Sequence, residues 1–113
     1  MCLFCDIVEG KIPSTKVYEN DYVLCFKDIN PVAPVHVLVV PKKHFANINE
    51  LASDPEGALY SAEITKAIAE VAKICGVSDA YRTINNCGEA AGQTVMHVHF
   101  HVIGGTTLTE KLI

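Results

Sequence analysis

The sequence predicts an α+β fold, in which an antiparallel sheet of about five strands is covered by one long helix and one or two short helices. Three observations predict it. Residues 97–103 alternate histidine with apolar residues, residues 36–41 are mostly β-branched and apolar, and residues 53–75 repeat apolar side chains at spacings of three and four. The first two patterns are typical of strands, and the third is typical of a helix that packs on a sheet.

The composition is that of a single globular domain over residues 1–113. Half of the residues are hydrophobic and 19% are charged, which excludes a disordered chain. The net charge of −4 argues against binding to a nucleic-acid backbone. We expect no membrane span, because no apolar run reaches about 18 residues, and no signal peptide, because the N-terminus lacks a charged region followed by an apolar one. The five cysteines, an odd number, are expected to be thiols in the reducing cytoplasm.

Cys2 and Cys5 form a Cys-x-x-Cys ahead of a short amphipathic stretch, residues 6–9, which should end at Gly10. Such a pair can ligate zinc, carry out thiol redox chemistry or simply be buried. The βαβ pattern that accompanies redox pairs is missing. A zinc site needs two more ligands, for which His44 and His97 are candidates.

Residues 17–19 and 22–27 are predicted to form a β-hairpin, because Asn20-Asp21 supplies turn-forming residues between two strand-forming stretches. Residues 28–31 end the second strand, and Pro31 and Pro34 stiffen the loop that follows. The third strand, 36–41, should be covered on both sides, with His36 as a polar exception at its start. Residues 81–85 are predicted as the fourth strand, ahead of a glycine-containing loop over 86–95.

Residues 53–56, Ser-Asp-Pro-Glu, predict the start of the long helix, which should run to Cys75 and end at Gly76. We expect its sheet-facing stripe to consist of Leu59, Ala62, Ile68, Ala69, Ala72 and Cys75. Further apolar residues widen the stripe and allow a second partner beyond the sheet; these are Ala58, Ile64, Ala67 and Val71.

The stretch 97–103 places a histidine at every second position. On an extended strand such residues share one face at a spacing of about 6.7 Å, so His97, His99 and His101 should line one face. The other face should carry Val98, Phe100 and Val102. An imidazole, with an ordinary pKa of about 6.5, can be a nucleophile, a proton carrier or a metal ligand. The simpler alternative is a solvated polar face that happens to carry histidines.

This triplet resembles the signature of the histidine triad superfamily, and nearly the whole chain resembles its Hint branch, the histidine triad nucleotide-binding proteins. The matching segments are Phe4 with Ile12-Pro13, residues 28–31, 34–36 and 39–44, Asn86, and residues 92–95. The resemblance implies a HIT-like fold and a twofold homodimer in which the long helix joins the contact. It also implies a purine nucleoside phosphoramidase, which hydrolyses AMP-amine or related purine nucleotide conjugates through a nucleotidyl-histidine without a required cofactor.

The resemblance also implies roles for individual residues. His99 corresponds to the nucleophile, His101 to a donor to the phosphoryl oxygens, and His36 to an imidazole that supports the triad. In the nucleotide site, Asp28 would hold the ribose hydroxyls and Ile29 would pack on the base, beside Phe4. The residues implied around the phosphate are Asn86, Gly92, Gln93 and Thr94. Thr94 or a neighbouring imidazole would pass a proton to the departing amine.

In several branches of the superfamily a structural zinc is held by ligands that correspond here to Cys2, Cys5, His44 and His97, although many Hint proteins lack it. His97 would then be a ligand or an orienting residue, and only indirectly catalytic. Two other functions stay open: a metallohydrolase whose three triad histidines hold one metal, and a nucleotide-binding regulatory module with little turnover. The tail, 106–113, has no tryptophan, unlike the aromatic tail of well-known relatives, so the leaving group is not implied.

Overall fold

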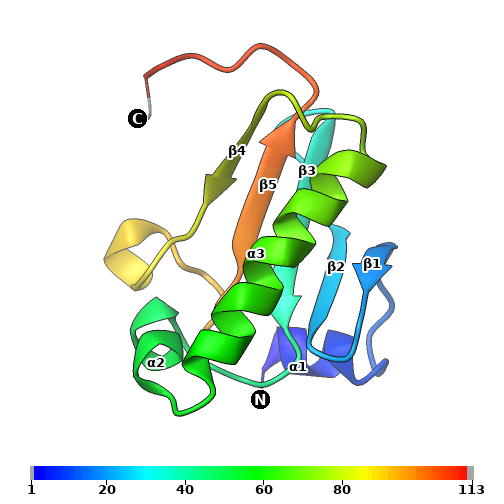
Figure 1. Cartoon of the computed structure of the whole chain (residues 1–113). Helices are drawn as coiled ribbons and strands as arrows, with labels where there is room; N and C mark the ends of the chain where they lie inside the picture. The colour runs from blue at the N-terminus through cyan, green and yellow to red at the C-terminus, as the bar shows by residue number, and fades with distance from the viewer. Residues whose placement is uncertain (1, 112–113) are drawn as a thin grey trace.

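A single antiparallel sheet is the centre of the computed structural model, which describes residues 2–111 (Figure 1). Its strands are β1 (Lys16–Glu19), β2 (Val23–Lys27), β3 (Val35–Pro41), β4 (Tyr81–Ile84) and β5 (Phe100–Gly104). They lie in the order β1-β2-β3-β5-β4, and every neighbouring pair is antiparallel. The predicted α+β fold with a sheet of five antiparallel strands is confirmed.

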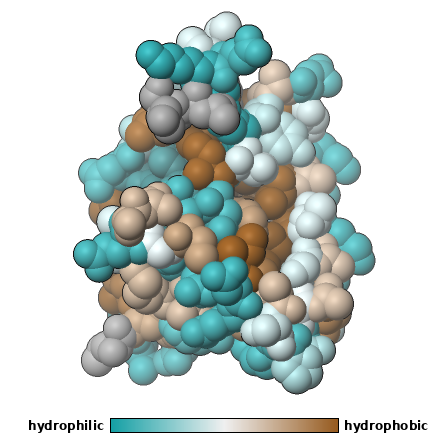
Figure 2. Space-filling view, turned by 90° about the vertical axis from the view of Figure 1, so that its left-hand side faces the viewer, coloured by the Kyte–Doolittle hydropathy of each residue, from teal (hydrophilic) through white to brown (hydrophobic). Residues whose placement is uncertain are grey.

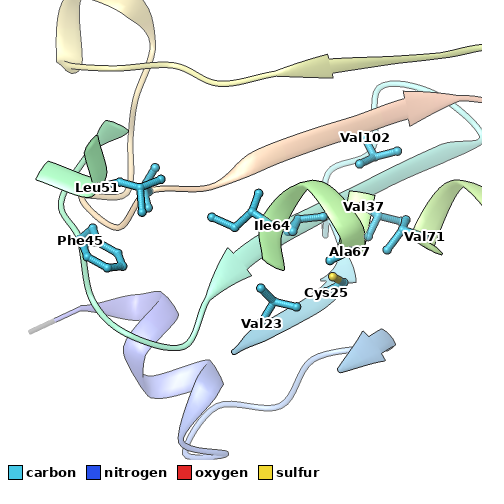
Figure 3. Close-up of a cluster of buried hydrophobic side chains, with 11 residues drawn as sticks. Val23, Cys25, Val37, Phe45, Leu51, Ile64, Ala67, Val71 and Val102 are labelled. Carbon is cyan, nitrogen blue, oxygen red and sulfur yellow. The ribbon is translucent and has the colours of Figure 1, made fainter. Parts of the chain in front are cut away.

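The long helix α3 (Gly57–Ile74) crosses one face of this sheet (Figure 1). Its buried side chains join a core from β2, β3, β5, the β3–α2 connection and the short helix that follows it, shown in Figure 3: Val23, Cys25, Val37, Phe45, Leu51, Ile64, Ala67, Val71 and Val102. The predicted stripe is only partly confirmed: Ala72 is buried and Ile68 and Cys75 pack against this core, but Ile64, Ala67 and Val71 form its centre and Leu59 is 41% exposed. Apolar residues form two rows along α3. The row that contains the β-branched residues Ile64 and Val71 packs against the sheet.

The predicted helix start at Ser53 was also wrong. Residues 48–53 form a separate helix, α2 (Ile48–Ser53), whose N-cap Asn47 accepts a hydrogen bond from the Glu50 N–H at 3.0 Å. The chain then leaves the helical conformation at Asp54, and α3 begins at Gly57. A Cβ atom at Gly57 would overlap the Leu51 carbonyl oxygen, so only glycine allows this tight junction between the two helices.

The opposite face of the sheet is covered by the short helix α1 (Leu3–Val8), which begins before the predicted stretch 6–9. Phe4 anchors it in a second core with Leu24, Phe26, Leu38 and Val40. At its start, the Cys2 sulfur accepts a hydrogen bond from the Cys5 N–H at 3.2 Å. Because α1 has only six residues, it covers part of this face and leaves the rest for a cavity.

The predicted strand over 97–103 is paired only from Phe100 onward, so its first half was wrong. The partner strand β3 ends at Pro41, and the Val98 N–H donates to the Phe45 carbonyl at 2.7 Å instead. The predicted alternation is confirmed, because Val98 and Val102 lie in the core beneath α3. The rings of His97 and His99 pack against Phe4 on the other side of the sheet.

Within residues 2–111, no helix combines the length and the apolar character needed to cross a lipid bilayer. The fourth strand ends at Ile84, one residue before the predicted end. The tail lies beside it, where the Arg82 guanidinium donates to the Thr109 carbonyl. Residues 112 and 113, the last two of the tail that contains no tryptophan, lie outside the described part of the chain.

Candidate active site

A cavity of about 750 Å³ lies beside α1, on the sheet face that carries the histidines. Its walls include six of the residues predicted for the nucleotide site: Phe4, Asp28, Ile29, Thr94, His99 and His101. Apolar side chains such as Ile7, Phe26 and Leu38 supply much of the remaining wall. Asn86, Gly92 and Gln93 do not reach this lining. The structure therefore brings together the residues predicted to bind the base and the ribose and two of the triad histidines. Three of the four residues predicted around the phosphate lie outside the cavity lining.

His99 is held in one orientation in the wall of this cavity and is 7% exposed. Its Nδ1 lies 2.8 Å from the His97 carbonyl oxygen, which can only accept a hydrogen bond. Nδ1 therefore carries the proton and Nε2 keeps its lone pair. The ring packs edge-on against Phe4, with centroids 5.0 Å apart. Burial lowers the pKa of His99, so the neutral imidazole is the form present at neutral pH.

Asn85 is a site residue that the sequence reasoning missed. Its Nδ2 donates to the His99 carbonyl at 2.9 Å, at the level where β4 has ended. This bond holds the backbone of His99 where ladder pairing stops. Two adjacent asparagines follow β4, and the family resemblance singled out only Asn86. No signal in the sequence separates their roles, because the register of β4 against β5 decides which one faces His99.

His101 lies at the other side of His99 and pairs with His36 from β3. The His36 Nε2 is 2.9 Å from the His101 Nδ1 and 3.3 Å from an Asp28 carboxylate oxygen. The other Asp28 oxygen accepts the Asn30 N–H at 2.8 Å. Burial, with the two neighbouring histidines, lowers the pKa of His101 to about 4. Three predicted residues thus form one contiguous polar group, in which His36 and His101 are hydrogen-bonded and the Asp28 carboxylate lies beside them.

Cys2, Cys5, His44 and His97 meet at the opposite end of the triad, as predicted from the sequence resemblance. The Cys2 sulfur lies 3.3 Å from the His97 Nδ1, and the Cys5 sulfur lies 3.3 Å from the His44 Nδ1. The two Nδ1 atoms are 3.2 Å apart. The His97 Nε2 donates to the Pro41 carbonyl at 2.8 Å, so its Nδ1 turns a lone pair toward the sulfurs.

These distances fit a tetrahedral zinc ion. With Zn–N bonds of about 2.0–2.1 Å and Zn–S bonds of about 2.3 Å, tetrahedral ligands lie about 3.3 Å apart for two nitrogens and about 3.6 Å for nitrogen and sulfur. The donor set of two thiols and two imidazoles is also one that zinc prefers. Burial, with Cys2 beside it, raises the pKa of the Cys5 thiol to about 11, and a bound cation would oppose that shift.

Asp28, His36 and His101 also place one potential ligand atom each within 4.8 Å of one another. Here, however, the Val32 N–H donates to the His36 Nδ1 at 3.1 Å, so the proton of a neutral His36 lies on Nε2, and that nitrogen has no lone pair for a metal. The nitrogens of His97, His99 and His101 do not converge among the described residues. The geometry therefore contradicts the alternative of one catalytic metal held by all three triad histidines.

The loop before the triad is held by Gln93, which is 2% exposed. Its Nε2 donates to the Ala46 and Val95 carbonyls at 2.7 and 3.0 Å, and its Oε1 accepts the Gly88 N–H at 2.8 Å. Gly92, with a φ of +94°, makes the left-handed turn that sends Gln93 inward. Thr94 then lies exposed at the cavity, while the Gln93 amide is fully used inside the loop.

Comparison with known proteins gives consistent results. The family model described as the HIT domain matches residues 9–108. Protein HitA of Neisseria gonorrhoeae is 41% identical over 103 residues, which cover 91% of this chain and 94% of HitA. The solved structure of a HIT family hydrolase from Clostridium thermocellum has a TM-score of 0.92 at 46% identity, covering 99% of this chain and 96% of that one. A histidine triad nucleotide-binding protein from Candida albicans has a TM-score of 0.82 at 30% identity, with 100% and 87% covered.

Proposed function

The chain belongs to the HIT domain family, and on that premise we propose that it hydrolyses nucleoside 5′-phosphoramidates, in which AMP or another purine nucleotide is linked to an amine. The hydrogen bond from the His99 Nδ1 to the His97 carbonyl carries the proposal, because it reserves Nε2 for attack. The hydrolase and nucleotide-binding names of two similar structures support it. So does the resemblance to the Hint branch.

The proposed reaction has two displacements at the α-phosphorus. The His99 Nε2 first bonds to phosphorus while the P–N bond breaks, and the amine leaves with one added proton. Water then bonds to phosphorus and gives up one proton, which replaces the proton taken by the amine, while the bond to Nε2 breaks; this releases the nucleotide and restores neutral His99. A neutral nucleophile avoids the repulsion that an anion meets at a phosphate. A donor on His101 stabilises the charge on the phosphoryl oxygens.

The same cavity accounts for nucleoside recognition in this proposal. The Asp28 carboxylate can accept two adjacent ribose hydroxyls, which gives bidentate recognition. Phe4 lies in the wall and Ile29, 91% exposed, lies at the rim, where a base can pack on it. Thr94 lines the cavity and, in this proposal, donates its hydroxyl to the phosphate. Asn86, Gly92 and Gln93 act in the proposal through the shape of the loop that carries Thr94.

We also propose that Cys2, Cys5, His44 and His97 hold a structural zinc ion. When bound, zinc would join α1 to the segment that leads into β5, and the phosphate chemistry would not involve it. Metal analysis of protein never exposed to a nickel column should find about one zinc per chain, and a chelator should lower the melting temperature. Substoichiometric zinc, or melting that a chelator leaves unchanged, would contradict this site.

A twofold homodimer in the cytoplasm completes the proposal. A hollow of about 330 Å³ on one side of the molecule is lined by apolar residues of α2, α3 and β5, among them Ile48, Ile68 and Phe100. Figure 2 shows hydrophobic surface in the hollow on this side. The outer face of α3 adds the exposed Leu59. Light scattering should give about twice the chain mass of 12.3 kDa, and a monomer at micromolar concentration would contradict the dimer.

The activity is tested with a fluorogenic adenosine phosphoramidate, by comparison of the wild type with His99→Ala. We expect release of the amine by the wild type and a loss of at least about 10³-fold in the variant, because no other group replaces the nucleophile. Nucleotide binding by both proteins should be measured in parallel. Equal rates in the two proteins would leave only a nucleotide-binding regulatory module.

A further inference from the structure

The backbone N–H of Val32 points at a ring nitrogen of the active site. It lies 3.1 Å from the Nδ1 of His36, which is itself buried at the start of β3. An amide N–H can only donate, so this Nδ1 must offer a lone pair. A neutral His36 therefore carries its proton on Nε2, and no proton can be added at Nδ1 without placing two N–H groups face to face.

The next bond in the chain passes this constraint to the triad. The His36 Nε2–H faces the His101 Nδ1 at 2.9 Å, with the Asp28 carboxylate farther away at 3.3 Å. Because the His36 nitrogen donates, the His101 Nδ1 must accept. The proton of a neutral His101 then lies on its Nε2. His101 lines the cavity, so this is the hydrogen that it has to offer a ligand there.

We infer that the Val32 amide is a positioning group that fixes the tautomers of His36 and His101, and that His101 is a hydrogen-bond donor to the phosphate and not the acid that protonates the amine. To give up its Nε2 proton and stay neutral, His101 would have to take one at Nδ1 from His36. His36 would then need a proton at its own Nδ1, where the Val32 N–H lies. The chain of proton transfers stops there.

The proton for the departing amine must therefore arrive by another route, either through the Thr94 hydroxyl at the cavity or directly from water. This part of the inference rests on the proposed function, whereas the tautomer assignment rests only on the three contacts. The Val32 side chain is 72% exposed, so its backbone and not its side chain makes the contribution. Residue 32 can then vary freely in type, except to proline.

The experiment begins with the wild-type protein as purified. Nitrogen-15 spectra that correlate ring nitrogens with ring hydrogens identify the tautomer of each histidine, with no need for turnover. We expect both His36 and His101 to carry the proton on Nε2 and a lone pair on Nδ1. A proton on Nδ1 of either residue in the neutral state would overturn the inference.

Two variants then test the amide itself. Val32→Pro deletes the N–H, and Val32→Ala is the matched control that keeps it. We expect Val32→Pro to show mixed tautomers at His36 and about a tenfold loss of kcat, while Val32→Ala matches the wild type. Wild-type tautomers and rate in folded Val32→Pro would overturn the role of the amide.

His36→Gln provides a second test, because its side-chain amide can donate to His101 without any partner at residue 32. Adding Val32→Pro to His36→Gln should then cost no further activity, and a further tenfold loss would contradict the inference. If the spectra are as expected but neither the wild type nor the variants release amine, the proposed function fails while the tautomer assignment stands. If Val32→Pro does not fold, the wild-type spectra still decide.

Discussion

His97 and His101 lie four residues apart on the same side of the sheet, and each belongs to a cluster of side chains of the types that ligate metals. At His97, Nε2 donates to the Pro41 carbonyl and Nδ1 faces two sulfurs and a second imidazole. At His101, Nδ1 accepts from His36, whose own Nδ1 accepts from a backbone N–H. The Pro41 carbonyl thus leaves the His97 Nδ1 with a lone pair that points at the cysteine sulfurs. The Val32 N–H instead orients His36 so that it donates to His101, and the cluster forms a chain of hydrogen bonds.

The three triad histidines thus differ in role because their backbone partners differ, although the residue type is the same. His99 lies between the two clusters and is bonded to the carbonyl of His97. Its Nε2 is therefore neither a ligand at the cysteine end nor a link in the chain at the His36 end. That position suits a nucleophile, which must keep its lone pair for the substrate.

The largest effect is expected from a variant that disrupts only the cluster of cysteines and histidines around His97. Cys5→Ser should remove zinc from the protein and lower the melting temperature by more than about 10 °C, because a structural zinc contributes several kcal/mol to folding. Plasma emission spectroscopy and thermal melts measure both effects. Asp28→Asn is the matched control at the other cluster and should keep a full complement of zinc. Zinc loss in both variants would mean that the two clusters are not distinct.

The next largest effect is expected at His101, at the opposite end of the triad. His101→Ala should lower kcat about 10²- to 10³-fold, the usual cost of removing a donor that stabilises transition-state charge, while zinc content stays at the wild-type value. Single-turnover kinetics with the adenosine phosphoramidate measure the loss. An unchanged kcat would show that His101 does not face the phosphate.

A smaller effect concerns the ribose contact. Asp28→Asn should raise KM about tenfold for a substrate with both ribose hydroxyls, because a charged acceptor of two hydrogen bonds is lost. A substrate that lacks both hydroxyls should bind the wild type and the variant equally weakly. If the variant prefers the substrate with both ribose hydroxyls as strongly as the wild type does, Asp28 does not take part in sugar recognition.

The smallest effect is on stability in mild acid. Burial holds the pKa of folded His101 at about 4, below the ordinary value of about 6.5 in the unfolded chain. Between these values the unfolded chain binds more protons, so the free energy of unfolding falls as pH drops from about 6.5 toward 4. Urea titrations over this range should show a shallower pH slope in His101→Gln than in the wild type. Parallel slopes would contradict the burial of His101.

The sequence predicted the parts of this site that depend on strand periodicity and on family resemblance. The side chains of His97 and His99 point to the same side, as the alternating pattern predicted, although strand pairing begins only at Phe100. The four candidate zinc ligands came together, and His36 lies against the triad, as the resemblance implied, whereas the contact of Asp28 with His36 was not predicted. What it could not predict depends on packing. Alanine-rich α3 offers two apolar rows, and only the sheet selects between them.

Asn85 and Val32 show the second limit. Each acts through one hydrogen bond to a site histidine or its backbone, and each bond depends on register or loop conformation. Val32 makes its contact through the main chain, which leaves no signature in the side-chain sequence. Gln93 shows the converse, since a residue matched to the phosphate loop has its side chain buried and fully hydrogen-bonded.

The most direct test of the central claim is to trap the covalent intermediate. Enzyme mixed with excess adenosine phosphoramidate should be denatured at alkaline pH during the first turnover, digested and mapped by mass spectrometry. The account predicts one added nucleotide on the Nε2 of His99, formed as fast as the amine is released. Amine release with the nucleotide on another histidine, or with no nucleotide bound to the chain at any time in that turnover, would contradict it.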